Sequence, residues 1–129
     1  MFFLTVEESF DAAHSLRHYE GKCARIHGHT WKVEVEVGGK ELNRAGMLID
    51  FSVLRKMLKE ILQEFDHCYL NEVAPFAEDG LNPTAENIAF YIYRRMKEKL
   101  AGVAPVLRVV QVTVFESERA RATYREGEE

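Results

Sequence analysis

Three histidines occur at spacings that suit a metal site. His27 and His29 are separated by one residue, at the start of a segment that alternates like a β-strand. Side chains at positions i and i+2 of a strand point to the same face, so both imidazoles can address one point. His14 ends an earlier strand-like segment, and a hairpin would bring it beside the pair. Three imidazoles without a fourth protein ligand are typical of catalytic zinc, which keeps one position open.

An H-x-H pair alone is a weak signal, because most single histidines are surface or hydrogen-bonded core residues. The addition of His14, and of Cys23 four residues before His27, favours a metal. An alternative of another class stays open, namely a non-catalytic, zinc-stabilised oligomeric binding module. Such a module would not need Cys23, His67 and Glu116 to converge on the metal.

Cys23 is a candidate catalytic base. A loop can hold its sulfur over the open side of the metal, and a neighbouring histidine can lower the pKa of a thiol or accept its proton. The N-terminus lacks a basic region and a small-residue cleavage site, so we expect no signal peptide and a cytoplasmic location. In that reducing compartment Cys23 and Cys68 are expected to be free thiols.

Two further polar positions have competing interpretations. Asp66 can orient His67 as a carboxylate orients the base of a catalytic triad, but His67 also suits a solvated helix end. Glu116 lies at the end of a strand and shares parity with Val110 and Val112. Its carboxylate could bind a paired N–H edge of a ligand, yet the residues alone favour a solvated strand end.

The elements that must position these groups follow from periodicity. Apolar alternation predicts strands, stripes at helical spacing predict helices, and Thr84 is a good N-cap for the second helix, which Gly102 and Pro105 would end. The predicted strands are 2–10, 30–37, 107–116 and 120–125, the last two joined by a turn at 117–118, and the helices follow Asp50 or Ser52 and Thr84. This ββααββ order predicts an α+β fold whose antiparallel sheet has both helices on one face. Its open edges predict completion by other subunits.

Composition narrows the class of protein. The 129 residues are 47% hydrophobic and 29% charged, which suits one globular domain over residues 1–129. The net charge is −4 and the basic residues form no block, which argues against nucleic acid or an anionic membrane as the main partner. No apolar run approaches the roughly 18 residues of a membrane span.

Six motifs in order resemble the 6-pyruvoyltetrahydropterin synthase family. The motifs are FDAAH at 10–14, CARIHGH at 23–29, GMLIDF at 46–51, DHCYLN at 66–71, PTAEN at 83–87 and VFE at 114–116. The three-residue gap between Cys23 and His27 is similar to the 6-carboxytetrahydropterin synthase branch of queuosine biosynthesis. The resemblance covers nearly the whole chain and implies the tunnelling fold, with subunits forming a barrel and commonly a homohexamer.

The resemblance also implies residue roles. His14, His27 and His29 match the Zn²⁺ ligands, Cys23 matches the catalytic base, and Asp66 with His67 matches its relay partners. Glu116 matches the residue that anchors the pterin ring, and Thr84 a threonine that helps to hold it. Ala85 departs from relatives that carry a second threonine there. Lys22 and Arg25 are candidates to meet a triphosphate.

The implied reaction is a zinc-dependent lyase reaction on a small pterin. It converts 7,8-dihydroneopterin triphosphate to 6-carboxytetrahydropterin, acetaldehyde and triphosphate, with zinc acting as a Lewis acid. A 6-pyruvoyltetrahydropterin synthase, which eliminates triphosphate without C–C cleavage, is the closer alternative. Only the carboxy branch releases acetaldehyde, so product analysis separates the two.

Overall fold

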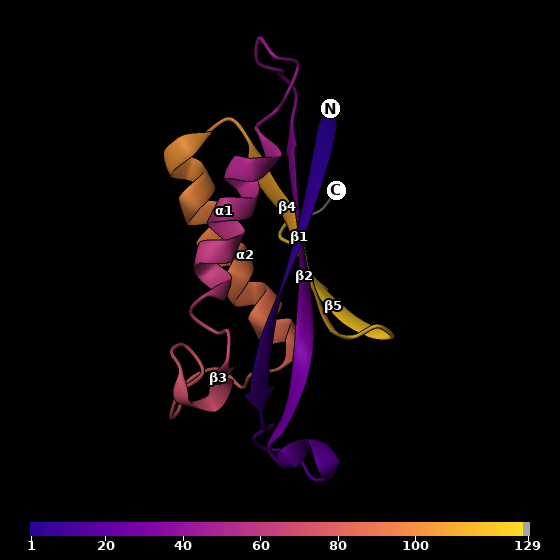
Figure 1. The fold of residues 1–129 in the computed structure, drawn as a ribbon, viewed down its shortest axis with the longest axis vertical. Coiled ribbons are helices and arrows are strands. Elements are labelled where there is room, and N and C mark those ends of the chain that lie inside the picture. The colour runs from indigo at the N-terminus through magenta and orange to yellow at the C-terminus, as the bar shows by residue number, and fades with distance from the viewer. Residues whose placement is uncertain (128–129) are drawn as a thin grey trace.

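A sheet covered on one face by two helices forms the protein, as the computed structural model shows for residues 1–127 (Figure 1). The strands are β1 (Phe2–His14), β2 (His27–Gly39), β3 (Cys68–Tyr69), β4 (Arg108–Ser117) and β5 (Ala120–Tyr124). The helices are α1 (Phe51–Leu62) and α2 (Ala85–Val103), with 3-10 turns η1 (Lys22–Ala24) and η2 (Leu70–Glu72). The predicted α+β fold with both helices on one face is confirmed, and the last two residues of the predicted domain lie outside the described part.

The sheet has the strand order β3-β1-β2-β4-β5. Neighbours are antiparallel except β3, which runs parallel to β1 and pairs Cys68 with Ala12 and Tyr69 with Ala13. The predicted antiparallel sheet is confirmed for β1, β2, β4 and β5, and β3 adds a short parallel pair at the edge that the sequence did not predict. The chain that leaves α1 passes along the unpaired edge of β1, where the His67 N–H donates to the Asp11 carbonyl at 2.6 Å and satisfies both backbone groups.

The core lies between the helices and the central strands. The predicted alternation of β2 is confirmed, since Trp31, Val33, Val35 and Val37 are fully buried. The apolar stripes of the two helices face these strands, as their spacing requires. The buried stripe residues are Leu54, Leu58, Ile61, Leu62 and Phe65 from α1 and the turn after it, and Ile88, Ile92, Met96 and Leu100 from α2.

Both helix starts follow the capping chemistry of the sequence. The Asp50 carboxylate accepts from the Ser52 N–H at 2.8 Å, so Asp50, not Ser52, is the N-cap of α1. The Thr84 hydroxyl accepts from the Asn87 N–H at 3.1 Å and caps α2 as predicted. Helix α2 ends at Val103, between Gly102 and Pro105, the two residues that were expected to end it.

The C-terminal hairpin differs from its prediction in two details. Its turn falls at residues 118–119 and not 117–118. The register of β4 against β2 shifts near Val110, because Val109 pairs with Val37 and Gln111 pairs with Glu36. This bulge gives Val109 the buried position and removes Val110 from the parity of Val112, so the parity assigned to Val110 is wrong.

Candidate metal centre

The hairpin of β1 and β2 brings the three histidines together. The antiparallel pairing continues to the ends of both strands, with His14 opposite His27 and Ala12 opposite His29. These four positions share the core face and form the two cross-strand pairs that follow the pair of Phe10 and Trp31. Pairing and alternation together therefore place three imidazoles at one end of the sheet, as the spacing predicted.

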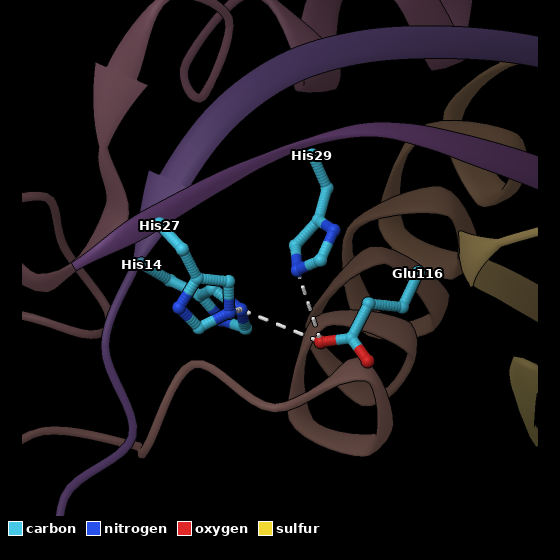
Figure 2. Close-up of side chains that lie close together, drawn as sticks. All are labelled: His14, His27, His29 and Glu116. Atoms are coloured by element: carbon cyan, nitrogen blue, oxygen red, sulfur yellow. Dashed lines mark hydrogen bonds and ion pairs between the residues drawn. The ribbon is translucent and has the colours of Figure 1, made fainter. Parts of the chain in front are cut away.

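The ring nitrogens converge with the Glu116 carboxylate (Figure 2). The Nε2 atoms of His14 and His27 are 3.0 Å apart. Glu116 Oε2 lies 3.3 Å from His14 Nε2 and 3.6 Å from His29 Nε2. One ligand atom from each of these four residues lies within 4.8 Å of the others.

Backbone carbonyls fix the tautomers of two of these rings. His14 Nδ1 lies 2.7 Å from the carbonyl oxygen of Pro83, and His27 Nδ1 lies 2.7 Å from that of Arg25. A carbonyl oxygen can only accept, so each Nδ1 carries the hydrogen. In the neutral rings both Nε2 atoms therefore present lone pairs to each other at 3.0 Å with no hydrogen between them. A cation bound between these acceptors would remove the repulsion between their lone pairs.

Burial favours the neutral form of His14 and of His29. Burial lowers the pKa of His14 below its ordinary value of 6.5, assisted by the neighbouring histidines and opposed by Pro83 and Glu116. Burial also lowers the pKa of His29. Among residues 1–127, the buried His29 Nε2 finds no hydrogen-bond donor or acceptor within bonding range. Neutral imidazoles are the form that binds metals.

The spacing and chemistry of the donor atoms fit a metal ion. Tetrahedral zinc with Zn–N bonds of about 2.0–2.1 Å separates its ligands by roughly 3.3 Å. The nitrogen separation of 3.0 Å between His14 and His27 needs only a small outward adjustment to reach that value. The Nδ1–H bonds to carbonyls are the outer contacts that usually orient metal-bound histidines. His14, His27, His29 and Glu116 could therefore hold a metal ion.

The stability of the metal-free protein is expected to fall as the pH drops below 6.5. The pKa of His14 is lower in the folded chain than in the unfolded one, so the unfolded chain takes up the proton first. This contribution to stability is complete above the pKa that His14 has in the unfolded chain. It is lost as the pH falls through the pKa that His14 has in the folded chain. Melting temperatures measured between about pH 7.5 and 5 should show this decline. The variant His14→Gln should decline less, and equal slopes would contradict the assignment.

The residues alone favoured a solvated strand end for Glu116, but its side chain lies beside the histidines. Its side chain is 34% exposed, so the carboxylate has both a protein side and an open side. Two roles fit this position. The carboxylate can join the metal ligands, or it can turn to accept two N–H groups from a bound molecule.

Cys23 lies in η1, in the loop between His14 and the His27–His29 pair. Its thiol is free and partly buried, and its carbonyl accepts from the Leu16 N–H at 2.9 Å. Its sulfur does not belong to the group of ligand atoms that lie within 4.8 Å of one another. The structure thus does not place the Cys23 sulfur among the candidate ligand atoms.

Asp66 and His67 lie together, away from the histidine cluster. His67 Nδ1 is 3.0 Å from Asp66 Oδ2, and the other carboxylate oxygen accepts from the Asp11 N–H at 2.9 Å. The Asp11 carboxylate belongs to the same group and binds the Thr30 hydroxyl at 2.5 Å. Asp11 and Thr30 alternate with the inward residues of β1 and β2, so this group belongs to the opposite face of the sheet.

This second group has features of a functional site. The His67 side chain is 78% exposed, and its backbone has φ 59°, which is uncommon for a non-glycine residue. The hydrogen bond from the Asp11 N–H lowers the pKa of Asp66, assisted by His67, so the carboxylate stays ionised. An open hollow beside it is lined by residues that include Ala13, Gly28 and Thr30. His29 also contributes to the lining of this hollow, but the ligand atoms of His67 and of the histidine cluster form two separate groups.

Thr84 lies next to the residue that orients His14. Its hydroxyl oxygen accepts a helix-capping hydrogen bond, which leaves the hydroxyl hydrogen available to another partner. The preceding carbonyl, that of Pro83, accepts from His14. The sequence prediction missed Pro83 and Arg25 as supports of the metal centre. No side-chain signal reveals them, because they contribute main-chain oxygens that every residue type possesses, and Pro83 lies 69 residues from His14.

Comparisons with known proteins place these features in a family context. The sequence profile of the family described as 6-pyruvoyl tetrahydropterin synthase matches residues 3–127. A 6-carboxy-5,6,7,8-tetrahydropterin synthase of Synechocystis is 42% identical over 118 residues, which cover 87% of this chain and 85% of the relative. A dihydroneopterin monophosphate aldolase of Pyrococcus furiosus is 37% identical over 101 residues, 78% of this chain and 80% of the relative.

Structural comparison gives the same answer. The 6-pyruvoyl tetrahydropterin synthase of Caenorhabditis elegans superposes with a TM-score of 0.80 at 28% sequence identity, covering 98% of both chains. The similarity therefore extends over the sheet, both helices and the loops that hold the histidines.

Within residues 1–127, neither helix is long and apolar enough to cross a membrane.

Proposed function

Because this chain belongs to the 6-pyruvoyl tetrahydropterin synthase family of pterin-processing lyases, we propose that it is a zinc-dependent 6-carboxytetrahydropterin synthase of queuosine biosynthesis in the cytoplasm. With one water, it would convert 7,8-dihydroneopterin triphosphate to 6-carboxytetrahydropterin, acetaldehyde and triphosphate. The observation that carries the proposal is the convergence of ring nitrogens from His14, His27 and His29, of which the Nε2 atoms of His14 and His27 can only accept. The names of relatives such as the Synechocystis protein support the carboxy product.

The metal would supply one element of the chemistry. A zinc ion held by the three histidines would act as a Lewis acid that makes the C–H beside a side-chain hydroxyl more acidic. The protein residues would hold and move the protons. Cys23 is our candidate for the base that removes this proton, because its thiol is free and its loop adjoins the histidines.

Glu116 and Thr84 would orient the substrate. The carboxylate of Glu116 has the two oxygens needed to accept the paired N–H donors of an aminopyrimidinone ring. Its proximity to the histidine nitrogens would hold the substrate side chain close to the metal, which is the positioning contribution to catalysis. The free hydroxyl hydrogen of Thr84 could donate to the same ring.

The location of Asp66 and His67 supports an active site shared between copies of the chain. We propose that these two residues serve as relay for the Cys23 of a neighbouring protomer. Ionised Asp66 holds the Nδ1 of His67 and leaves its Nε2 directed away, free to exchange a proton. The 78% exposure of His67 makes it accessible to a second chain.

Surface features support the same assembly. β1 pairs with β3 through two residues only, so most of its outer edge is open to another strand. Phe2, Phe3 and Phe51 are each about half exposed, at 49%, 51% and 52%, beside a hollow lined by Leu42 and Met47. Such an apolar patch is typical of an interface. A homohexamer whose subunits form a barrel is our proposal for the assembly.

Incubation of the purified protein with 7,8-dihydroneopterin triphosphate tests the function. The expected products are 6-carboxytetrahydropterin and acetaldehyde, detected by mass spectrometry and by trapping of the aldehyde. A 6-pyruvoyl product without acetaldehyde would replace the proposal by its closer alternative. A parallel incubation with 7,8-dihydroneopterin monophosphate is needed, because the relative from Pyrococcus furiosus is named an aldolase for that substrate. No product with either compound would favour a non-catalytic module.

A further inference from the structure

The segment that follows His14 is held by two asparagine side chains. The Ser15 N–H donates to Asn71 Oδ1 at 3.0 Å, and Asn71 Nδ2 donates back to the Ser15 carbonyl at 2.9 Å. The Arg17 N–H donates to Asn82 Oδ1 at 2.9 Å, and Asn82 Nδ2 donates back to the Arg17 carbonyl at 3.0 Å. Each amide thus satisfies both backbone groups of one residue.

The hydrogen bonds of these two side-chain amides take the place of those that a neighbouring strand would make. In an extended chain, the backbone groups of alternate residues point to the same side, so residues 15 and 17 face the loop that carries the asparagines. The intervening Leu16 N–H points the other way and donates to the Cys23 carbonyl at 2.9 Å. The segment from Ser15 to Arg17 therefore joins the loop of Cys23 on one side to the two asparagines on the other.

The same asparagine loop supplies the carbonyl that orients His14. Asn82 immediately precedes Pro83, whose oxygen accepts from His14 Nδ1 at 2.7 Å. The Asn82 carbonyl is itself fixed by the Thr84 N–H at 2.8 Å and by Asn87 Nδ2 at 3.0 Å, at the start of α2. The guanidinium of Arg17 binds the carbonyls of Phe76 and Leu81 in the same loop. Two connections, one through Arg17 and one through Pro83, thus close a ring that includes His14.

We infer that Asn71 and Asn82 are positioning residues for the metal centre, an inference that rests on the metal site proposed above. They hold the loop of residues 70–83 in register with the end of β1, which sets the hydrogen bond between Pro83 and His14. That bond orients the ring and presents Nε2 to the metal. The asparagines touch neither metal nor substrate. Their effect passes through Ser15, Arg17 and Pro83.

Zinc affinity of variants tests the inference. Asn82→Ala and Asn71→Ala are each expected to bind zinc about tenfold more weakly than the parent in a chelator competition, the lower end for outer contacts of a metal site. Their cobalt-substituted forms should also show altered visible absorption, because the geometry of the ligands shifts. Asn43→Ala is the matched control. It loses two turn hydrogen bonds, from the N–H groups of Ala45 and Met47, but should keep the affinity of the parent.

Each result decides one point. Parent-like affinity and spectrum in both asparagine variants, whatever their melting temperatures, would overturn the inference and leave a purely structural role. If Asn82→Ala does not fold, Asn82→Asp serves instead, since it keeps the acceptor for the Arg17 N–H but replaces the donor to the Arg17 carbonyl by a charged oxygen. Its affinity should also fall, and parent-like binding would overturn the inference. A parent that binds no zinc would refute the proposed metal site itself.

Discussion

Replacement of Cys23 by alanine is expected to lower turnover by about two orders of magnitude or more, the usual loss when an acid–base group is removed. Zinc content and melting temperature should stay close to those of the parent. The reason is that, in the proposed site, three histidines would provide the ligands of the protein, and the Cys23 sulfur lies outside the group of ligand atoms formed by His14, His27, His29 and Glu116. Zinc stoichiometry, melting temperature and turnover are measured on the same preparation.

Cys68→Ala is the matched control for this experiment. Cys68 is the other free thiol, partly buried like Cys23, with weak contacts from its sulfur to the carbonyls of Glu64 and Asp66. Its loss should leave turnover near that of the parent. If Cys23→Ala loses zinc and stability together, Cys23 is a structural ligand, because metal binding and folding are linked. Full activity with full zinc would exclude both roles.

Mixed oligomers of two inactive variants are expected to regain activity. Cys23→Ala and His67→Ala alone should each be nearly inactive. In a random one-to-one mixture, about one quarter of the sites combine an intact Cys23 from one chain with an intact His67 from its neighbour, if the site is shared across a symmetric interface. Co-expressed chains with two different tags allow the mixed oligomer to be purified, and its turnover should approach about that fraction of the parent.

A second mixture controls for effects of assembly. Cys23→Ala combined with the double variant Cys23→Ala, His67→Ala contains no intact Cys23, so it should stay inactive. Recovery only in the first mixture would support an active site that spans two chains. If doubly tagged oligomers form and the first mixture also stays inactive, Asp66 and His67 do not act on the site of another chain. A monomeric mass at micromolar concentration would remove the shared site altogether.

Local patterns in the sequence were sufficient to predict the helices and strands and part of the candidate metal site. The alternation around Trp31 fixed the inward face of β2, and the same period of two placed His27 and His29 on that face. Asp50 and Thr84 marked the helix starts because their side chains satisfy N–H groups only two or three residues away. Such features depend on neighbours in the chain, and their signals are therefore readable without the fold.

Tertiary structure decided the features that depend on distant partners. The residues alone favoured a solvated strand end for Glu116, and only the pairing of β4 with β2 carries it to His14 and His29. The parallel pairing of β3 and the bulge at Val110 follow from long-range registers that period and propensity do not encode.

The main-chain group that orients His14 in the candidate metal centre could likewise not be predicted from the sequence. Pro83 reaches His14 from 69 residues away and contributes a carbonyl that every residue type possesses. The adjacency of Asp66 and His67 suggested a pair, but the sequence could not tell on which side of the sheet the pair lies. The path of the chain after α1 decides that, because it follows the free edge of β1. The sequence thus determined which groups can do the chemistry, while long-range hydrogen bonds determined which of them meet within one chain.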